Sequence, residues 1–416
     1  MPGFESLILG EKTAVIFDIG FAYTKCGFAG EAGPRFIFPT EVTLPNGDTK
    51  HFMFLRTAQE RRKFFIEFFH HLYYKHLLVN PKDRRVVVVD SILSTSGFRG
   101  LIADVLYNHF EIPSALFAPA HLLSLFTLGL SSAVVLDCGF QEAMTIPVYE
   151  GYTLLNAWQA GQLGSHAIYK NLEQLLRENA TVVNESGDAL PLSSCTSGDC
   201  LLSTEVLEDI IARTAFISPA SRAADWRNWL DAQSDPETAN KVESPKVAED
   251  AFYYPLNNLK GSKRLLIPSR IRELSVECLF TGDSDKITLA TLLLQSILLS
   301  PIDIRRTLAQ NIVVIGGTVN IPGFTCRLVE ELNACLDWPE FASLSALKGE
   351  FRIHQPPGEP NYVAWLGGAI FGALESLPGR SLERNAYLEK GELPDWTSAI
   401  DASPQISTGR TEATRH

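Results

Sequence analysis

Three short apolar segments, each ending abruptly at glycine, constrain the fold of this chain more than any other feature of its sequence. They are AVIFDIG at 14–20, AVVLDCG at 133–139 and NIVVIGG at 311–317. Runs rich in β-branched residues predict buried strands, and the glycine predicts a tight turn directly after each strand. The first two segments share an Asp-x-Gly ending, which predicts two related lobes that face one cleft.

Signals for helices stand between these segments. Thr57 and Glu60 have the spacing of a capping box at the start of the aromatic run RRKFFIEFFHHLYYKHLL, which we expect Asn80-Pro81 to end. VVVVD at 86–90 predicts another central strand, and Ser300-Pro301 predicts the start of a helix before the third glycine segment. This alternation of strands and helices predicts the α/β class.

The composition of the chain argues against binding to nucleic acid. The 416 residues are 20% charged and 45% hydrophobic, which is typical of a globular chain with more than one lobe. Lys and Arg number 36 against 48 Asp and Glu, a formal net charge of −12. Binding to a phosphate backbone requires a basic field, so we expect no nucleic acid partner.

The sequence also indicates a compartment. Seven scattered cysteines without a CxxC pair, and an N-terminus without a basic and apolar leader, predict a protein of the cytosol or nucleus. The uncharged run at 113–136 is long enough to span a membrane, but Pro119 and Gly129 interrupt it. We therefore expect a helix near 119–128 and a strand near 132–137, and a core helix at 362–374, with no membrane insertion.

The glycine turns are chemically suited to phosphate. Glycine lets backbone N–H groups approach an anion, and an aspartate can hold a hydrated cation beside it. In these turns and the residues around them the chain resembles the actin family, and GFAG, PVYEGY and GGT followed by PG are typical of actins. The resemblance spans about 12–396, and the segments that carry it are 15–40, 135–154, 302–323 and 361–377.

The resemblance implies an actin-like two-lobed fold with a central nucleotide-type cleft and a reduced outer subdomain at about 40–56. Two regions of loose composition, 178–204 and 219–262, are interpreted as loop insertions on the second lobe. The implied order is a first lobe, a second lobe, a return to the first lobe and a disordered tail, at 1–140, 141–350, 351–396 and 397–416.

Eight residues of the actin pattern remain at the cleft. The resemblance implies either that they hold ATP or ADP without turnover, or that they only preserve the turns that close the strands, and the residues leave both interpretations open. They are Asp18, Gly20, Lys25, Asp137, Gly139, Gly316, Gly317 and Thr318.

The departures from the actin pattern remove ligands. Actins have Ser-Gly where this chain has Phe21 and Ala22, and Asp-Gly where it has Phe140 and Gln141. A hydroxyl that would hold phosphate and a carboxylate that would help to organise the cation are therefore lost.

Catalytic and base-binding positions have changed as well. The resemblance places the residues that orient the attacking water at Ala120 and Met144, and the pair that flanks the adenine at Ile211 and Ala212. Neither Ala120 nor Met144 can orient water. We assign no catalytic residue and no metal ligand, and expect the protein not to be an enzyme.

The interval from Thr40 to the His70-His71 pair is much shorter than in conventional actins, and there the family carries the loop that grips the next filament subunit. HLLVNPKDRRVVVVDS at 76–91 and RIHQPP at 352–357 resemble the pointed-end actin-related member of dynactin. The resemblance implies a cytoplasmic, cytoskeletal cap of an actin-like filament. Its partners would be the filament subunits, other pointed-end dynactin subunits and, indirectly, dynein in microtubule transport.

Two other interpretations stay open. One is a nuclear actin-related subunit of a chromatin-remodelling complex, and the other is an active actin-fold ATPase. The proteins that co-purify from cytosol would distinguish the first from a dynactin subunit, and a turnover assay would test the second.

Overall fold

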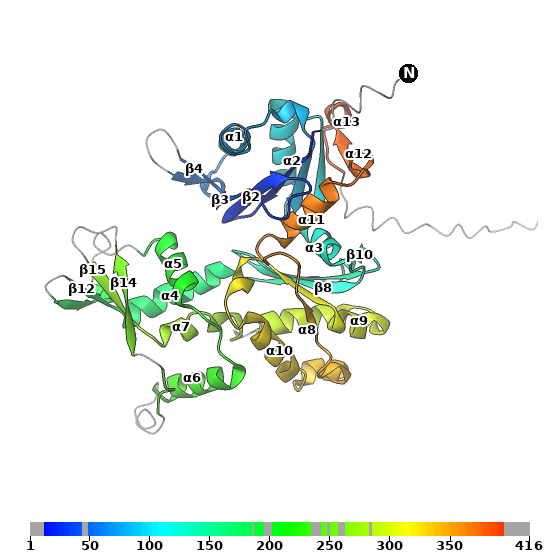
Figure 1. Ribbon diagram of the computed structural model, residues 1–416. Coiled ribbons are helices and arrows are strands. Elements are labelled where there is room, and N and C mark those ends of the chain that lie inside the picture. Colours follow the sequence, from blue (N-terminus) through cyan, green and yellow to red (C-terminus); the bar gives the residue numbers. More distant parts are fainter. Residues whose placement is uncertain are drawn as a thin grey trace, which may run out of the picture.

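The computed structural model shows two lobes joined by a pair of helices (Figure 1). It describes residues 12–43, 49–184, 187–194, 202–233, 243–247, 250–256, 263–282 and 285–394. The fold is mixed α/β with a six-stranded sheet in the first lobe and a second large sheet in the other lobe, as the sequence predicted. The tail at 397–416 lies outside the described residues.

The sheet of the first lobe combines parallel and antiparallel pairs. β1, β6 and β7 are parallel, and β2 and β3 continue the sheet on the other side of β1 as antiparallel strands. The register places Asp18 of β1 opposite Lys25 of β2. In spatial order the strands are β18 (Leu382–Glu383), β7 (Ser114–Pro119), β6 (Val86–Asp90), β1 (Val15–Ile19), β2 (Tyr23–Phe28) and β3 (Phe36–Pro39).

An aromatic helix covers this sheet. α1 (Ala58–His71) begins with the capping box that the sequence predicted between Thr57 and Glu60. It continues as a wider turn through Leu77 and stops at Leu78, whose φ is +53°, so the helix ends before the expected Asn80-Pro81. The other helices of this lobe are α2 (Ser96–Asp104), α12 (Leu377–Arg380) and α13 (Arg384–Lys390).

Between β3 and α1 the described chain forms one small hairpin. β4 (Glu41–Thr43) pairs with β5 (Thr49–His51), and a single 3-10 turn (Phe52–Phe54) follows. Buried Val42 and Phe52 attach the hairpin to the core of the first lobe.

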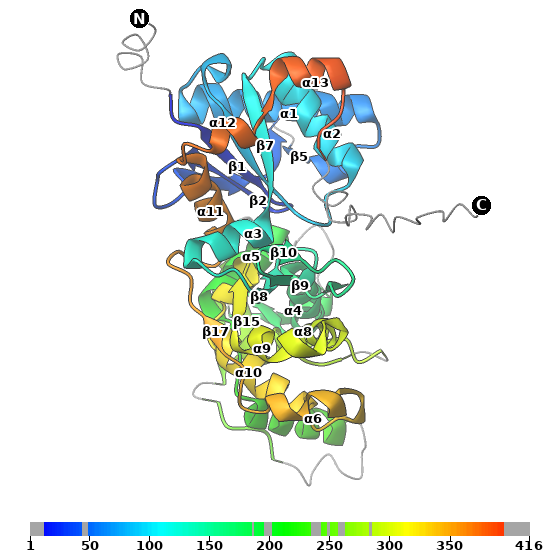
Figure 2. The same ribbon diagram turned by 90° about the vertical axis from the view of Figure 1, so that its right-hand side faces the viewer.

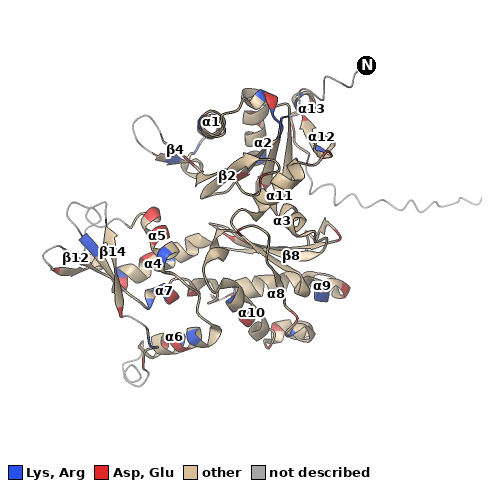
Figure 3. Ribbon diagram, viewed as in Figure 1, with Lys and Arg blue, Asp and Glu red and all other residues tan. Residues whose placement is uncertain are grey.

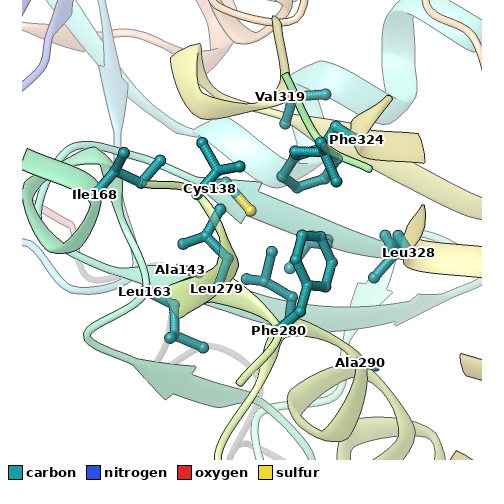
Figure 4. Packing of buried hydrophobic residues seen from close by; sticks show 14 of the residues in the cluster. Cys138, Ala143, Leu163, Ile168, Leu279, Phe280, Ala290, Val319, Phe324 and Leu328 are labelled. Atoms are coloured by element: carbon teal, nitrogen blue, oxygen red, sulfur yellow. The ribbon is translucent and has the colours of Figure 1, made fainter. Parts of the chain in front are cut away.

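The second lobe is built around β8 and β16, which are parallel neighbours. Buried residues from the sheet and the surrounding helices form its core, part of which Figure 4 shows around Cys138 and Phe324. The strands are β10 (Tyr152–Thr153), β9 (Ala143–Tyr149), β8 (Ala133–Cys138), β16 (Ile312–Ile315) and β17 (Ile353–His354), with β11 (Gln159–Gly161) beside β9. The helices include α4 (Ser165–Asn179), α7 (Ile271–Leu274), α8 (Leu289–Leu299), α9 (Arg305–Gln310) and α10 (Phe324–Cys335).

One helix start was predicted wrongly. Ser300 ends α8 rather than capping the next helix, because its hydroxyl donates back to the Ser296 carbonyl at 2.9 Å. A 3-10 turn at Ile302–Ile304 follows Pro301, and α9 begins only at Arg305.

The two regions interpreted as loop insertions contain regular structure. Their described residues form helix α6 (Ala220–Gln233) and three strands of a four-stranded sheet. The sequence concealed the strands because the apolar side chains of Leu190 and Tyr253 occupy exposed positions, so apolar and polar residues do not alternate along β13 and β14. The strands are β13 (Ala189–Pro191), β12 (Thr181–Val183), β15 (Lys263–Pro268) and β14 (Ala251–Leu256).

Two helices connect the lobes, as Figures 1 and 2 show. We call α3 (Ala120–Leu128) and α11 (Val363–Gly372) the connecting helices. Leu123 and Trp365 pack against the sheet of the first lobe, whereas Leu125 and Val363 pack against that of the second. Both helices lie where the sequence predicted them, and the uncharged run at 113–136 is divided into β7, α3 and the start of β8.

Charged residues lie mainly on the outer helices, such as α6, α9 and α10, and the central strand β8 carries few of them (Figure 3). Among the described residues, no helix combines the length and the apolar character needed to cross a bilayer.

Candidate cleft between the lobes

All eight residues that the sequence singled out line one cleft of about 600 Å³ between the lobes. The β1–β2 turn and the β8–β9 turn face each other across it, and the turn after β16 and helix α5 (Thr204–Thr214) complete the wall. Ala120, Ile211 and Ala212 also line this cleft. Met144 is not among its lining residues, because it is buried in β9 opposite Asp137.

Lys25, the cationic residue among these eight, already has an acidic partner. The Nζ atom of Lys25 lies 3.0 Å from the Oδ2 atom of Asp18, and both side chains are largely buried. This pairing follows from the antiparallel register of β1 and β2. Because Asp18 offsets the positive charge of Lys25, the pair attracts an anion much less than a free lysine would.

Asp137 stands at the end of β8 in a setting that disfavours its charge. Burial raises the pKa of the Asp137 carboxyl to about 7, and the negative Asp18 and Glu142 act in the same direction, against the opposing effect of Lys25. Near neutral pH the group is therefore divided between its neutral and charged forms.

Two of the glycines are required by the fold itself. A Cβ atom at Gly20 would lie 2.6 Å from the Tyr23 carbonyl oxygen, and one at Gly316, whose φ is +104°, would lie 2.2 Å from the Cys138 carbonyl oxygen. These contacts account for both glycines without a ligand. A Cβ atom at Gly317, by contrast, would meet no atom within 4 Å.

Backbone donors at the two facing turns are engaged within the turns. The N–H of Gly20 donates to the Tyr23 carbonyl at 3.1 Å, and that of Gly139 donates to the Glu142 carbonyl at 3.0 Å. The Thr318 hydroxyl donates to the Gly139 carbonyl at 3.1 Å and lies 2.9 Å from the Ser165 hydroxyl. These groups thus stabilise the turns and their contact with the residues after β16.

Two aromatic rings occupy the space between the facing turns. Phe21 and Phe140 stack with their centroids 5.3 Å apart and their planes 8° from parallel. The sequence showed that both positions had lost a ligand, but it did not show that the replacements contact each other.

A second contact across the cleft was missed by sequence analysis. The Tyr23 hydroxyl of β2 lies 2.8 Å and 2.7 Å from the two carboxylate oxygens of Glu208 in α5. Neither residue belongs to a recognisable motif, and 185 positions separate them, so no local signal indicated this pair.

No group of three or more His, Cys, Asp or Glu side chains in the described parts of the chain has the arrangement of a metal site. The three histidines of the aromatic run are used in local contacts. His76 stacks on Phe38, and His71 lies 3.1 Å from the Lys75 amine.

Comparison with known proteins agrees with the two-lobed architecture. The family model described as Actin matches residues 63–187 and 233–394, which is more than half of the chain. The match begins after the first Asp-x-Gly turn and the small hairpin, and residues 188–232 lie between its two parts.

Two similar proteins come from Dictyostelium discoideum. Actin-related protein 10 is 28% identical over 442 aligned residues, which cover 93% of this chain and 90% of that protein. Putative actin-29 is 25% identical over 406 aligned residues, which cover 91% of this chain and 95% of that protein. Together with the family match, these similarities and the fold lead to one conclusion: the chain belongs to the actin family.

Proposed function

We propose that this protein is a non-catalytic actin-related subunit of dynactin that caps the pointed end of its actin-like filament and supports dynein-driven transport along microtubules. One observation carries the proposal. The described chain between β3 and α1 consists of a small hairpin and one 3-10 turn, where conventional actins carry a larger outer subdomain that grips the next subunit.

The geometry of filaments explains why this feature suits a cap. A polar filament uses two different faces of each subunit, and such heterologous contacts continue indefinitely unless one face is absent. A subunit with a reduced outer subdomain keeps the face that docks on the filament and lacks part of the face that accepts another subunit. The exposed side is then free for other pointed-end dynactin subunits.

The cleft supports the non-catalytic part of the proposal. Phe21 and Phe140 stand between the facing turns, and Ala120 replaces a residue that orients water in actins. Any ATP or ADP in this cleft is held without turnover, because the groups that would activate water are missing.

The name of one relative, Actin-related protein 10, supports a place among actin-related proteins. A dynactin subunit of this kind works in the cytoplasm, on the cytoskeleton. The alternative, a nuclear subunit of a chromatin-remodelling complex, would share the fold but bind different partners. Affinity purification from separate cytosolic and nuclear fractions distinguishes these two: dynactin subunits in the cytosolic fraction support the proposal, and remodelling subunits in the nuclear fraction contradict it.

Single-filament imaging tests capping directly. Labelled full-length protein is added to polarity-marked filaments of the actin-like dynactin subunit, with labelled conventional actin as the control. We expect one spot at each pointed end and arrested growth there, whereas actin should extend both ends. Binding along filament sides, binding at barbed ends, or filaments formed by the pure protein would each contradict the capping model.

A further inference from the structure

We infer that the two lobes are latched across the cleft by the protein's own side chains, so that the closed cleft does not depend on a bound nucleotide. The latch consists of the Tyr23–Glu208 hydrogen bonds and the Phe21–Phe140 stack. This inference concerns the conformation of the chain itself and does not rest on the proposed partner.

The polar half of the latch joins β2 of the first lobe to α5 of the second. A hydroxyl that donates to a carboxylate forms a charge-assisted hydrogen bond, which is stronger than a bond between neutral groups. Burial, and then the adjacent Glu208 carboxylate, raise the pKa of the Tyr23 phenol well above its ordinary value. The phenol therefore stays protonated and remains a donor throughout the physiological pH range.

The aromatic half is supported from both lobes. Phe21 lies 4.5 Å from the His51 ring between centroids, and the His51 Nε2 atom lies 2.7 Å from the Phe21 carbonyl oxygen. On the other side, Phe140 packs edge-on against Tyr169 of α4 at 5.5 Å and stacks on His166 at 5.7 Å. Each ring is thus held in place by its own lobe before it meets the other.

His51 links the latch to the reduced outer subdomain. It is the last residue of β5, is itself buried, and stacks on Phe52 at 4.7 Å. The small hairpin therefore folds onto the β1–β2 turn and supports Phe21. The short segment before α1 and the aromatic replacements at the cleft, which look unrelated in the sequence, form one continuous set of contacts.

The connecting helices supply another link between the lobes. Ala120 of α3 and Ala364 of α11 line the same cleft as Tyr23 and Glu208. The lobes are thus joined through the connecting helices and again through the latch. Rotation about the connecting helices requires both parts of the latch to separate.

Three of the groups that would let a nucleotide link the lobes are already in use. Lys25 is paired with Asp18, and the amides of Gly20 and Gly139 are bonded within their turns. A phosphate would have to displace these contacts and enter between the stacked rings. Closure by side chains therefore replaces closure by a ligand.

Hydrogen exchange on the full-length protein tests the latch. Nucleotide and divalent cations are removed with apyrase and EDTA, and amide exchange is followed in the β1–β2 turn and in α5. We expect slow exchange in wild type with or without this treatment. Tyr23→Phe should accelerate exchange in both segments by about tenfold to a hundredfold, because it loses a charge-assisted bond. Phe140→Leu should accelerate exchange in the same segments by about twofold to tenfold, because it loses an aromatic pair.

Matched controls separate the latch from general loosening. Tyr253→Phe removes the same hydroxyl from a tyrosine that is 60% exposed on β14, and Phe54→Leu makes the same change as Phe140→Leu at a phenylalanine that is 83% exposed. Both controls should exchange like wild type. The effects of Tyr23→Phe and Glu208→Gln should be strongly non-additive, because Tyr23→Phe removes the bond whose acceptor Glu208→Gln leaves uncharged and weaker.

Three results would overturn the inference. They are equal exchange in Tyr23→Phe and Tyr253→Phe, additive effects of Tyr23→Phe and Glu208→Gln, or opening of wild type when nucleotide is removed. None of them alters the outcome of the filament-end assay, so failure of the latch and failure of the capping model are distinguishable.

Discussion

Gly367 of α11 lies directly against the backbone of Leu123 in α3, so closely that a Cβ atom at position 367 would be 2.0 Å from the Leu123 carbonyl oxygen. The next glycine, Gly368, faces Ile16 and Val89 of the first-lobe sheet. Absence of a side chain thus lets the two connecting helices approach each other at the junction of the lobes. Backbone atoms cannot move aside as a flexible side chain can, so this contact is intolerant of substitution.

Gly367→Ala should therefore destabilise the protein strongly. Overpacking of a tight site costs about 1–3 kcal/mol and occasionally more. Gly100→Ala in α2 is the matched control, because a Cβ atom there meets nothing within 4 Å and alanine favours a helix interior by up to about 1 kcal/mol. Thermal unfolding should show a lower midpoint for Gly367→Ala and an equal or higher one for Gly100→Ala. Equal midpoints for the two variants would contradict the close packing of α3 and α11.

A second prediction concerns a buried ion pair in the second lobe. Arg327 is 1% exposed, and its two terminal nitrogens each lie 3.0 Å from an oxygen of Glu277. Glu277→Ala removes one of the two carboxylates that compensate this buried charge, the other being Glu331 at 2.7 Å, and should cost about 1–3 kcal/mol in the free energy of unfolding. The control is Glu340→Ala, which breaks an exposed pair with Lys286 and should cost less than about 1 kcal/mol.

The double variant Glu277→Leu with Arg327→Leu refines this test. It removes the buried guanidinium together with Glu277 and should be less destabilising than Glu277→Ala, because the remaining Glu331 is partly exposed to solvent. Denaturation by urea at one pH compares all of these proteins. A double variant that is less stable than Glu277→Ala would show that packing of the arginine stem, rather than its charge, decides the stability.

The raised pKa of Asp137 predicts a pH dependence. In the unfolded chain the carboxyl loses its proton near its ordinary pKa of 3.8, whereas in the native protein it keeps the proton up to about pH 7. Between these values the native state binds more protons than the unfolded state. The contribution of this group to stability therefore falls as the pH rises from about 4 to 7, by up to about 1.4 kcal/mol per pH unit, and is constant above that range.

Asp137→Asn should remove this contribution. We expect its stability relative to wild type to increase from pH 5 to pH 7 and to level off above, as measured by urea midpoints at each pH. Asp337→Asn, at an exposed carboxylate paired with Lys348, is the control and should follow wild type. Parallel curves for Asp137→Asn and wild type would contradict the assignment.

Reversing the replacements in the two facing turns should restore nucleotide binding. A variant with Phe21→Ser, Ala22→Gly, Phe140→Asp and Gln141→Gly removes the stacked rings and returns a carboxylate for a hydrated cation. Its affinity for a fluorescent ATP analogue with Mg²⁺ should rise about tenfold or more over wild type, since each recovered ligand contributes about 1–3 kcal/mol.

The same variant should release no more phosphate than wild type. Ala120 and Met144, which stand at the positions that the resemblance assigns to orienting water, are unchanged. Phe54→Leu is the control for both measurements and should behave like wild type. Turnover by wild type that disappears in Asp18→Asn would contradict the non-catalytic interpretation.

Local patterns were sufficient for the central elements of the fold. β1, β8 and β16 lie where runs of β-branched residues before glycine predicted them, because a strand that is buried on both faces leaves a continuous apolar signal. The capping box of Thr57 and Glu60 was also predicted from the sequence, since it involves residues only three positions apart. Seven of the eight cleft residues lie at or just after the ends of these strands and therefore meet at that edge, whereas Lys25 belongs to β2 opposite Asp18.

Local patterns failed where the signal was weak or ambiguous. The strands within 178–204 and 219–262 were not predicted because apolar residues such as Leu190 and Tyr253 stand at exposed positions, so apolar and polar residues do not alternate there. Ser300 was assigned to the wrong helix because a serine between two helices can bond in either direction, and the sequence does not indicate which.

The contacts across the cleft depend on how the lobes are placed. Phe21 and Phe140, like Tyr23 and Glu208, come from different lobes, and each residue taken alone indicates only a lost ligand or an ordinary polar side chain. Their meeting depends on the packing of α3 against α11, where Gly367 sets the distance between the helices. Contacts between residues so far apart in sequence result from many packing interactions throughout the fold. No short segment of the sequence contains enough information to predict them.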